Sequence, residues 1–198
     1  MSDYTISLVP SVSRYAFAEI AVDDILKWLV SKDIVKAELS ECTLGNLGYA
    51  FSDGAQYIVS ECTLGNLGYA FSDGAQYIVL EPHFLPYQLD INGLEITTER
   101  TIFNTGQNGI DRIVCPNCTE NIVDNEWDLD PWYQGFTDNL LCPICGTESD
   151  IHQYVFEPQW GFSNLGFTFW NWPELKPEFI VELQEKLNCD LVVVGSHI

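Results

Sequence analysis

The sequence predicts an α+β fold, with an antiparallel or mixed sheet, two main helices and an inserted four-cysteine zinc ribbon. Three observations support it: two segments with apolar residues at helical spacing, several strand-like segments separated by turn residues, and two Cys-Pro-x-Cys pairs separated by 23 residues. A chain of 198 residues, 46% of them hydrophobic, can bury its own core. We therefore assign residues 1–198 to a single α+β domain and residues 112–149 to a zinc-ribbon subdomain within it.

The N-terminal part of the chain predicts a strand followed by a helix. Residues 4–9 alternate in polarity, as a short strand does. From Ser13 or Arg14 to about Val35, apolar residues recur at helical spacing, which is typical of an amphipathic helix packed on a core. This is the first of the two main helices.

A tandem duplication follows, because residues 40–59 are repeated without change as residues 60–79. Old structural repeats retain only a pattern, so twenty identities in twenty indicate a recent duplication in a parent of 178 residues. Glycines and Ser-Asp-Gly predict turns in each copy, and residues 55–59, with their repeat 75–79, predict a strand. Which copy keeps the parental contacts is left open by the sequence. The longer connection would also permit domain swapping, so the oligomeric state is open too.

The part after the duplication predicts short strands, a helix and a final strand. Three strands are expected, at residues 88–91, 94–98 and 100–103. Asn92-Gly93 is a typical hairpin turn between the first two. Near the end, Pro177 begins a helix that closes around Asn188, and residues 190–195 form an apolar run typical of a buried strand.

The two Cys-Pro-x-Cys pairs predict one metal site with four ligands: Cys115, Cys118, Cys142 and Cys145. Each pair folds into a tight turn that directs both sulfurs toward one ion. Four thiolates complete the tetrahedral shell of Zn²⁺ and leave no position for water, so the expected ion is structural. Iron is the alternative, since the motif also resembles rubredoxin. Zinc is favoured because Thr119-Glu120-Asn121 replaces the glycine and aromatics of that family.

The strongly negative charge of the chain limits the partners that it can bind. Eight basic residues against 29 acidic ones give a net charge of −21, which repels nucleic acids and anionic membrane surfaces. The chain shows no signal peptide and no long apolar run, and its cysteine usage suits a reducing cytoplasm. The loop between the cysteine pairs combines many acids with four aromatic residues: Trp127, Trp132, Tyr133 and Phe136. These aromatics either pack against the main body or form a contact site for a basic partner.

Other side chains provide no catalytic site. His83 and His152 are expected to be ordinary histidines rather than ligands or proton carriers, and Cys42, Cys62 and Cys189 have no histidine nearby in sequence. Phosphate-binding, dinucleotide, nucleophile-elbow and zinc-protease motifs are missing. The leading hypothesis is a non-enzymatic, zinc-stabilised protein that binds an unknown protein partner. A rubredoxin-like iron electron carrier and an acidic decoy or immunity-type inhibitor of a basic protein are the alternatives.

Residues 110–198 resemble an uncharacterised family of bacterial zinc-ribbon proteins. The resemblance rests on the cysteine pairs, on the segment FSNLGFTFWNWP at residues 162–173, and on the proline-started helix and Val-Val-Val strand after it. Some members are labelled sugar transporter ATPases, but this chain lacks the phosphate-binding loop such an activity needs. The resemblance implies a bacterial cytoplasmic protein with a zinc ribbon and implies no activity. The aromatics of residues 156–173 are expected to cover the core, or otherwise to line a groove.

Overall fold

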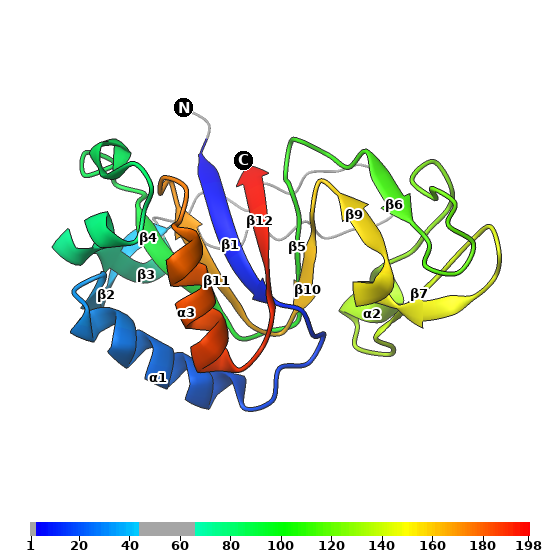
Figure 1. The fold of residues 1–198 in the computed structure, drawn as a ribbon, viewed down its shortest axis with the longest axis horizontal. Helices are drawn as coiled ribbons and strands as arrows, with labels where there is room; N and C mark the ends of the chain where they lie inside the picture. Colours follow the sequence, from blue (N-terminus) through cyan, green and yellow to red (C-terminus); the bar gives the residue numbers. More distant parts are fainter. Residues whose placement is uncertain (1–2, 44–65) are drawn as a thin grey trace.

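The computed structural model describes residues 3–43 and 66–198, so residues 55–59, predicted as a strand, lie outside the described part. The described chain is α+β, as expected, and its main sheet has six strands in the order β12-β1-β11-β4-β3-β2 (Figure 1). Every pair of neighbouring strands is antiparallel. The strands are β1 (Tyr4–Pro10), β2 (Val35–Thr43), β3 (Asn66–Phe71), β4 (Gly93–Thr97), β11 (Gly166–Trp170) and β12 (Leu191–His197).

Two helices, α1 (Ala18–Ser31) and α3 (Pro177–Leu187), cover one face of this sheet (Figure 1). Leu29 of α1 and Leu183 of α3 are buried in the same hydrophobic cluster as Leu8 of β1. Both helices bury one apolar stripe and expose the opposite side, as expected for surface helices. Removal of these apolar side chains from water is the main force that holds the helices on the sheet.

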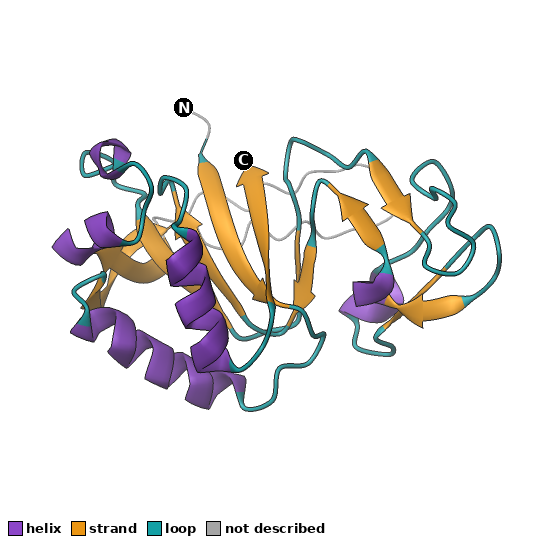
Figure 2. Cartoon of the chain, in the orientation of Figure 1, coloured by secondary structure: helices purple, strands orange, loops and turns teal. Residues whose placement is uncertain are grey.

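Three two-stranded sheets and several short helical turns complete the fold (Figure 2). The sheets pair β5 (Thr101–Phe103) with β10 (Gly161–Ser163), β6 (Arg112–Val114) with β9 (Val155–Glu157), and β7 (Asn139–Leu141) with β8 (Glu148–Asp150). The turns are α2 (Asp130–Tyr133), η1 (Asp73–Tyr77), η2 (Pro82–Phe84) and η3 (Ile151–Gln153). The β6–β9 pairing closes a segment that contains all four predicted ligands. We call residues 112–157 the cysteine module.

The cysteine module has a hydrophobic cluster of its own, beyond β5 and β10 from the main sheet (Figure 1). Cys115, Cys142 and Trp132 are buried in it. Five further buried residues of this cluster come after the ribbon predicted at residues 112–149: Ile151, Tyr154, Phe156, Trp160 and Phe162. The clustered cysteines thus pack with aromatic side chains that follow them in sequence.

Several predicted elements are confirmed. The strands expected at residues 4–9, 94–98 and 100–103 appear as β1, β4 and β5, each within about one residue. The helix expected from Pro177 is α3, and Asn188 ends it in the left-handed conformation (φ 46°) that asparagine tolerates. The strand expected at residues 190–195 is β12, but it lies at the edge of the sheet and is only partly buried.

The first predicted helix is too long at both ends. The structure begins α1 at Ala18 and ends it at Ser31, and Asp33 then turns the chain with a φ of 56°. Ile34 and Val35, which fit the helical spacing, are buried at the start of β2, where Val35 pairs with Phe71. An apolar pair at a helix end fits both the spacing of a helix and the apolar run of a buried strand. The pairing of β2 with β3 selects the strand.

Two local predictions after the helix are wrong. Residues 88–91 form no strand; the Asn92 main-chain N–H donates to the Cys42 carbonyl, and Gly93 lies inside β4 rather than in a hairpin turn. In the second copy, residues 73–77 form η1 where a strand was expected, and the glycine-rich segment before them forms β3. A Cβ at Gly68 would press on the Thr43 side chain, so this glycine permits close packing rather than a turn.

Each copy of the duplication contributes residues to a different one of two neighbouring strands. The first copy supplies the end of β2, through Thr43, and the second supplies β3 and η1, from Asn66 onward. Thr43 and Asn66 are partners in the antiparallel register. The 22 residues between them therefore connect two adjacent positions of one strand pair.

Glu95 in the middle of the sheet predicts a pH dependence of stability. Burial raises the pKa of this carboxyl above its ordinary value, although the Trp170 indole N–H donates to it at 2.9 Å. A raised pKa in the folded state means that folding is penalised once pH rises above the unfolded value of about 4.5. We expect Glu95→Gln to be more stable than the wild type at pH 7. The difference between their free energies of unfolding, measured by urea titration, should shrink as pH falls to 4; a constant difference would contradict this origin.

Candidate metal centre

The structure brings all four predicted cysteines together at one point. Their sulfur atoms all lie within 4.8 Å of one another, and no other group of potential ligands of this kind occurs in the described part of the chain. The Sγ atoms of Cys115 and Cys145 are 3.9 Å apart, and those of Cys118 and Cys142 are 3.8 Å apart. A tetrahedron with metal–sulfur bonds of about 2.3 Å has edges of about 3.8 Å, so these separations fit one ion.

The two Cys-Pro-x-Cys turns have the same main-chain hydrogen bonds. In the first, Thr119 N–H donates to the Cys115 carbonyl and Cys115 N–H to that of Glu120. In the second, Gly146 N–H donates to Cys142, and Cys142 N–H donates to Thr147, with all four distances between 2.9 and 3.0 Å. This repeated geometry directs each pair of sulfurs to the same side of its turn.

The residue after each turn is left-handed in both cases. Gly146 has a φ of 69°, and Thr119 has a φ of 61°, which is uncommon for a β-branched residue. The missing glycine at position 119 therefore does not change the backbone of the first turn. This removes the glycine part of the sequence-based preference for zinc over iron, while the absence of the rubredoxin aromatics after the first turn still favours zinc.

The four sulfurs differ in how readily they ionise. Hydrogen bonds from Asn117 and Thr147 lower the pKa of Cys145 to about 6. At Cys118 the main-chain hydrogen bond at Glu120 favours the thiolate, but burial and the other cysteine sulfurs outweigh it and raise the pKa to about 12. A divalent ion held between the four sulfurs would favour their thiolate forms. The four cysteines are thus placed to hold one metal ion.

Replacement of Gly146 by alanine tests whether the left-handed turn contributes to metal retention. No atom lies within 4 Å of a Cβ placed there, so Gly146→Ala should cost only the left-handed conformation, about 1–2 kcal/mol. We expect lower stability and weaker metal retention against a chelator. Gly109→Ala is the control, because Gly109 is also left-handed and open but lies outside the module. The control should lose stability without losing metal; equal metal retention in both variants would contradict a role for this turn.

The aromatic residues of the loop between the cysteine pairs divide into two sets. Trp132 is buried and Trp127 partly buried in the cluster of the module, as packing against the body predicts. Tyr133 and Phe136 are 53% and 83% exposed. The aromatics of residues 156–173 are buried, which confirms that they cover the core; among them are Trp160, Phe162, Phe167, Phe169 and Trp172.

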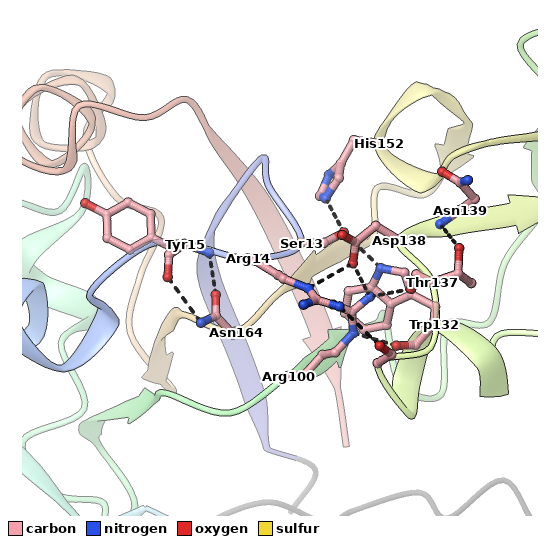
Figure 3. Close-up of polar contacts among 11 residues, drawn as sticks. Ser13, Arg14, Tyr15, Arg100, Trp132, Thr137, Asp138, Asn139, His152 and Asn164 are labelled. Atoms are coloured by element: carbon pink, nitrogen blue, oxygen red, sulfur yellow. Dashed lines mark hydrogen bonds and ion pairs between the residues drawn. The ribbon is translucent and has the colours of Figure 1, made fainter.

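The remaining candidate residues stay outside the four-sulfur cluster. Half-buried His152 contacts the Ser13 hydroxyl at 3.2 Å through Nε2 (Figure 3), and burial lowers its pKa, which keeps the ring neutral at pH 7. His83 is exposed beside Phe84. Cys42 is buried and Cys189 half-buried, both away from the metal ligands, while Cys62 lies outside the described residues.

Sequence reasoning missed three polar side chains that contact the module or its cysteines. Arg100, Ser13 and Asn117 carry no motif, and each acts on residues far from it in sequence. The one available signal for Arg100 was the rarity of basic residues, which makes each arginine of this chain worth attention, and the sequence offered no signal for Ser13 or Asn117.

Comparisons with protein-family models, curated proteins and solved structures find no match to this chain. The resemblance to the bacterial zinc-ribbon family therefore stays a prediction. None of the helices in residues 3–43 and 66–198 has the length and apolar character needed to span a membrane.

Proposed function

We propose that this chain is a non-enzymatic protein, stabilised by one structural zinc ion at the four cysteines, that binds a basic protein through the outer surface of its cysteine module. The observation that carries the proposal is the exposure of Tyr133 and Phe136 on a rigid support. Both follow closely on Trp132, which is anchored in the buried cluster. Exposed aromatics on a preorganised element are frequent energetic centres of interfaces.

The charges of the module support a basic partner. Among the described residues of the module, seven carboxylates form no ion pair: Glu120, Asp124, Glu126, Asp128, Asp130, Glu148 and Asp150. The one basic residue within the module, Arg112, is already paired with Glu157 at 3.0 Å. A four-thiolate zinc centre adds two further negative charges. Such a surface attracts cations and repels acidic partners.

The test combines partner capture with two alanine variants. Partners captured by the wild-type chain are identified, and their affinities for Phe136→Ala and Phe84→Ala are measured at two salt concentrations. Phe84 is the control, because it is 62% exposed but lies on η2, outside the module. We expect a basic partner whose affinity falls at least about tenfold in Phe136→Ala, falls with salt, and is unchanged in Phe84→Ala. Equal affinities for both variants would indicate an acidic decoy that acts through charge alone.

A rubredoxin-like iron electron carrier is the second candidate. Supporting it, both turns share one backbone geometry, with Thr119 left-handed despite its side chain. In addition, Cys145 is exposed and Cys118 partly exposed, so part of a metal–sulfur centre would reach the surface, as electron transfer requires. Metal content and the visible spectrum of the purified protein distinguish the two. One colourless zinc per chain supports the structural role, and a red protein with one iron and a reversible couple supports electron transfer.

A further inference from the structure

One largely buried arginine provides several of the polar contacts between the cysteine module and the rest of the chain. Arg100 precedes β5, outside the module, and its side chain is 14% exposed. The guanidinium donates to the main-chain carbonyls of Trp132 and, at 2.9 Å, of Thr137, and it lies 2.8 Å from an Asp138 carboxylate oxygen (Figure 3). Its carbon is also 3.8 Å from the centroid of the Trp132 ring. All four contacts fall in the segment 132–138.

The same segment is contacted from a second side by the loop after β1. The Trp132 indole N–H donates to the Ser13 hydroxyl at 2.9 Å, and Arg14 donates to the Gly135 carbonyl at 3.1 Å. Arg14 also lies 3.5 Å from Asp138, but it is 64% exposed, so this pair contributes little. Arg100 is therefore the principal polar connection, and Ser13 and Arg14 support it (Figure 3).

The contacted segment is continuous with the metal ligands. Trp132 is buried in the same cluster as Cys115 and Cys142, and Asp138 is followed at once by β7, which ends directly before Cys142. If the metal leaves, the cysteine turns lose their common centre and the segment loses its fixed shape. Arg100 would then be a buried charge without its partners, which is strongly unfavourable.

We infer that Arg100 couples metal binding at the cysteines to docking of the module on the rest of the chain. The inference rests on the proposed metal site, but it concerns residues outside that site. Coupling of this kind is reciprocal: if metal binding strengthens the contacts of Arg100, those contacts strengthen metal binding by the same factor. A chain that loses its metal therefore also releases the module, and Arg100 is the positioning residue that transmits the change.

The test measures zinc affinity by competition with a chelator in the whole chain. We expect Arg100→Ala to weaken zinc binding about 5- to 150-fold, the usual range for coupled sites. Arg100→Lys keeps the charge but loses the planar fork, so it should show a smaller loss while remaining folded. The control is Lys32→Ala, which removes a 2.7 Å ion pair with Glu182 between α1 and α3 and should leave zinc affinity unchanged.

A second readout separates coupling from a merely structural effect. Hydrogen exchange of the β5 amides should increase when the wild-type chain is stripped of metal, and this increase should be smaller in Arg100→Lys. Zinc affinity within twofold of the wild type in both arginine variants would overturn the inference. A wild-type chain that binds no zinc at all would instead overturn the proposed metal site.

Discussion

Replacing Cys142 with serine is expected to abolish metal binding and to unfold the cysteine module. Cys142 is buried, and its sulfur is 3.8 Å from that of Cys118, so its loss removes one corner of the ligand set. Binding of a structural zinc contributes on the order of 10 kcal/mol, which is comparable with the whole stability of a domain. The measurement is metal content together with a thermal unfolding curve. Cys118→Ser should behave in the same way, because the four ligands act as one unit.

Cys189→Ser is the matched control for these variants. Cys189 lies outside the metal cluster, and its thiol donates to the neighbouring Asp190 carbonyl at 3.4 Å. Its replacement should leave metal content and the unfolding curve as in the wild type. A Cys142→Ser protein that unfolds like the wild type would show that the metal has no structural role. The amides of β1 and β11 should keep more protection from hydrogen exchange than those of the module, because the main sheet has a separate core.

Deletion of residues 44–63 is expected to stabilise the protein by about 2 kcal/mol. The deletion leaves Leu64-Gly65 between Thr43 and Asn66, which are already partners in the β2–β3 register. A two-residue connection is the commonest hairpin loop, and shortening a connection from 22 to two residues reduces the entropic cost of closing it. Because the two copies are identical, removal of either one gives this same 178-residue chain. Urea unfolding of the two chains measures the difference.

A slightly longer deletion provides the control. Removing residues 44–65 joins Thr43 directly to Asn66, so no residue remains to form the turn and the strand pair should be disrupted. We expect this chain to be less stable than the wild type. If the 178-residue chain is itself insoluble or less stable, the second copy contributes contacts that the fold requires.

The sequence allowed the elements with strong local signals to be predicted. Pro177 at a helix start and Asn188 at its end define α3, and the valines of β12 identify a strand. The end of α1 was not predictable, because Ile34 and Val35 suit both a helix and a strand. The glycine at position 68 was interpreted as a turn, although it lets β3 approach β2 closely. In each case the deciding contact comes from another strand.

At the candidate metal site, too, some features could be predicted from the local sequence and others depend on contacts with distant residues. Cysteine spacing was enough to predict that the four cysteines lie together, because two short turns direct their sulfurs toward one point. The exposure of Phe136 and the burial of Trp132, four residues apart, could not be read from composition. Which aromatic faces inward depends on Arg100 and Ser13, and both come from distant parts of the chain.

The sequence by itself therefore determined the fold class, the cluster of four cysteines, the helix after Pro177 and the duplication. These depend on periodicity, spacing and identity, which are properties of the chain taken in order. Only the tertiary structure decided that β2 and β3 divide the two copies between them, and that Arg100 holds the module in place. Those features depend on which residues meet across the fold, where strand register and the burial of charge select one arrangement from several that the local sequence permits.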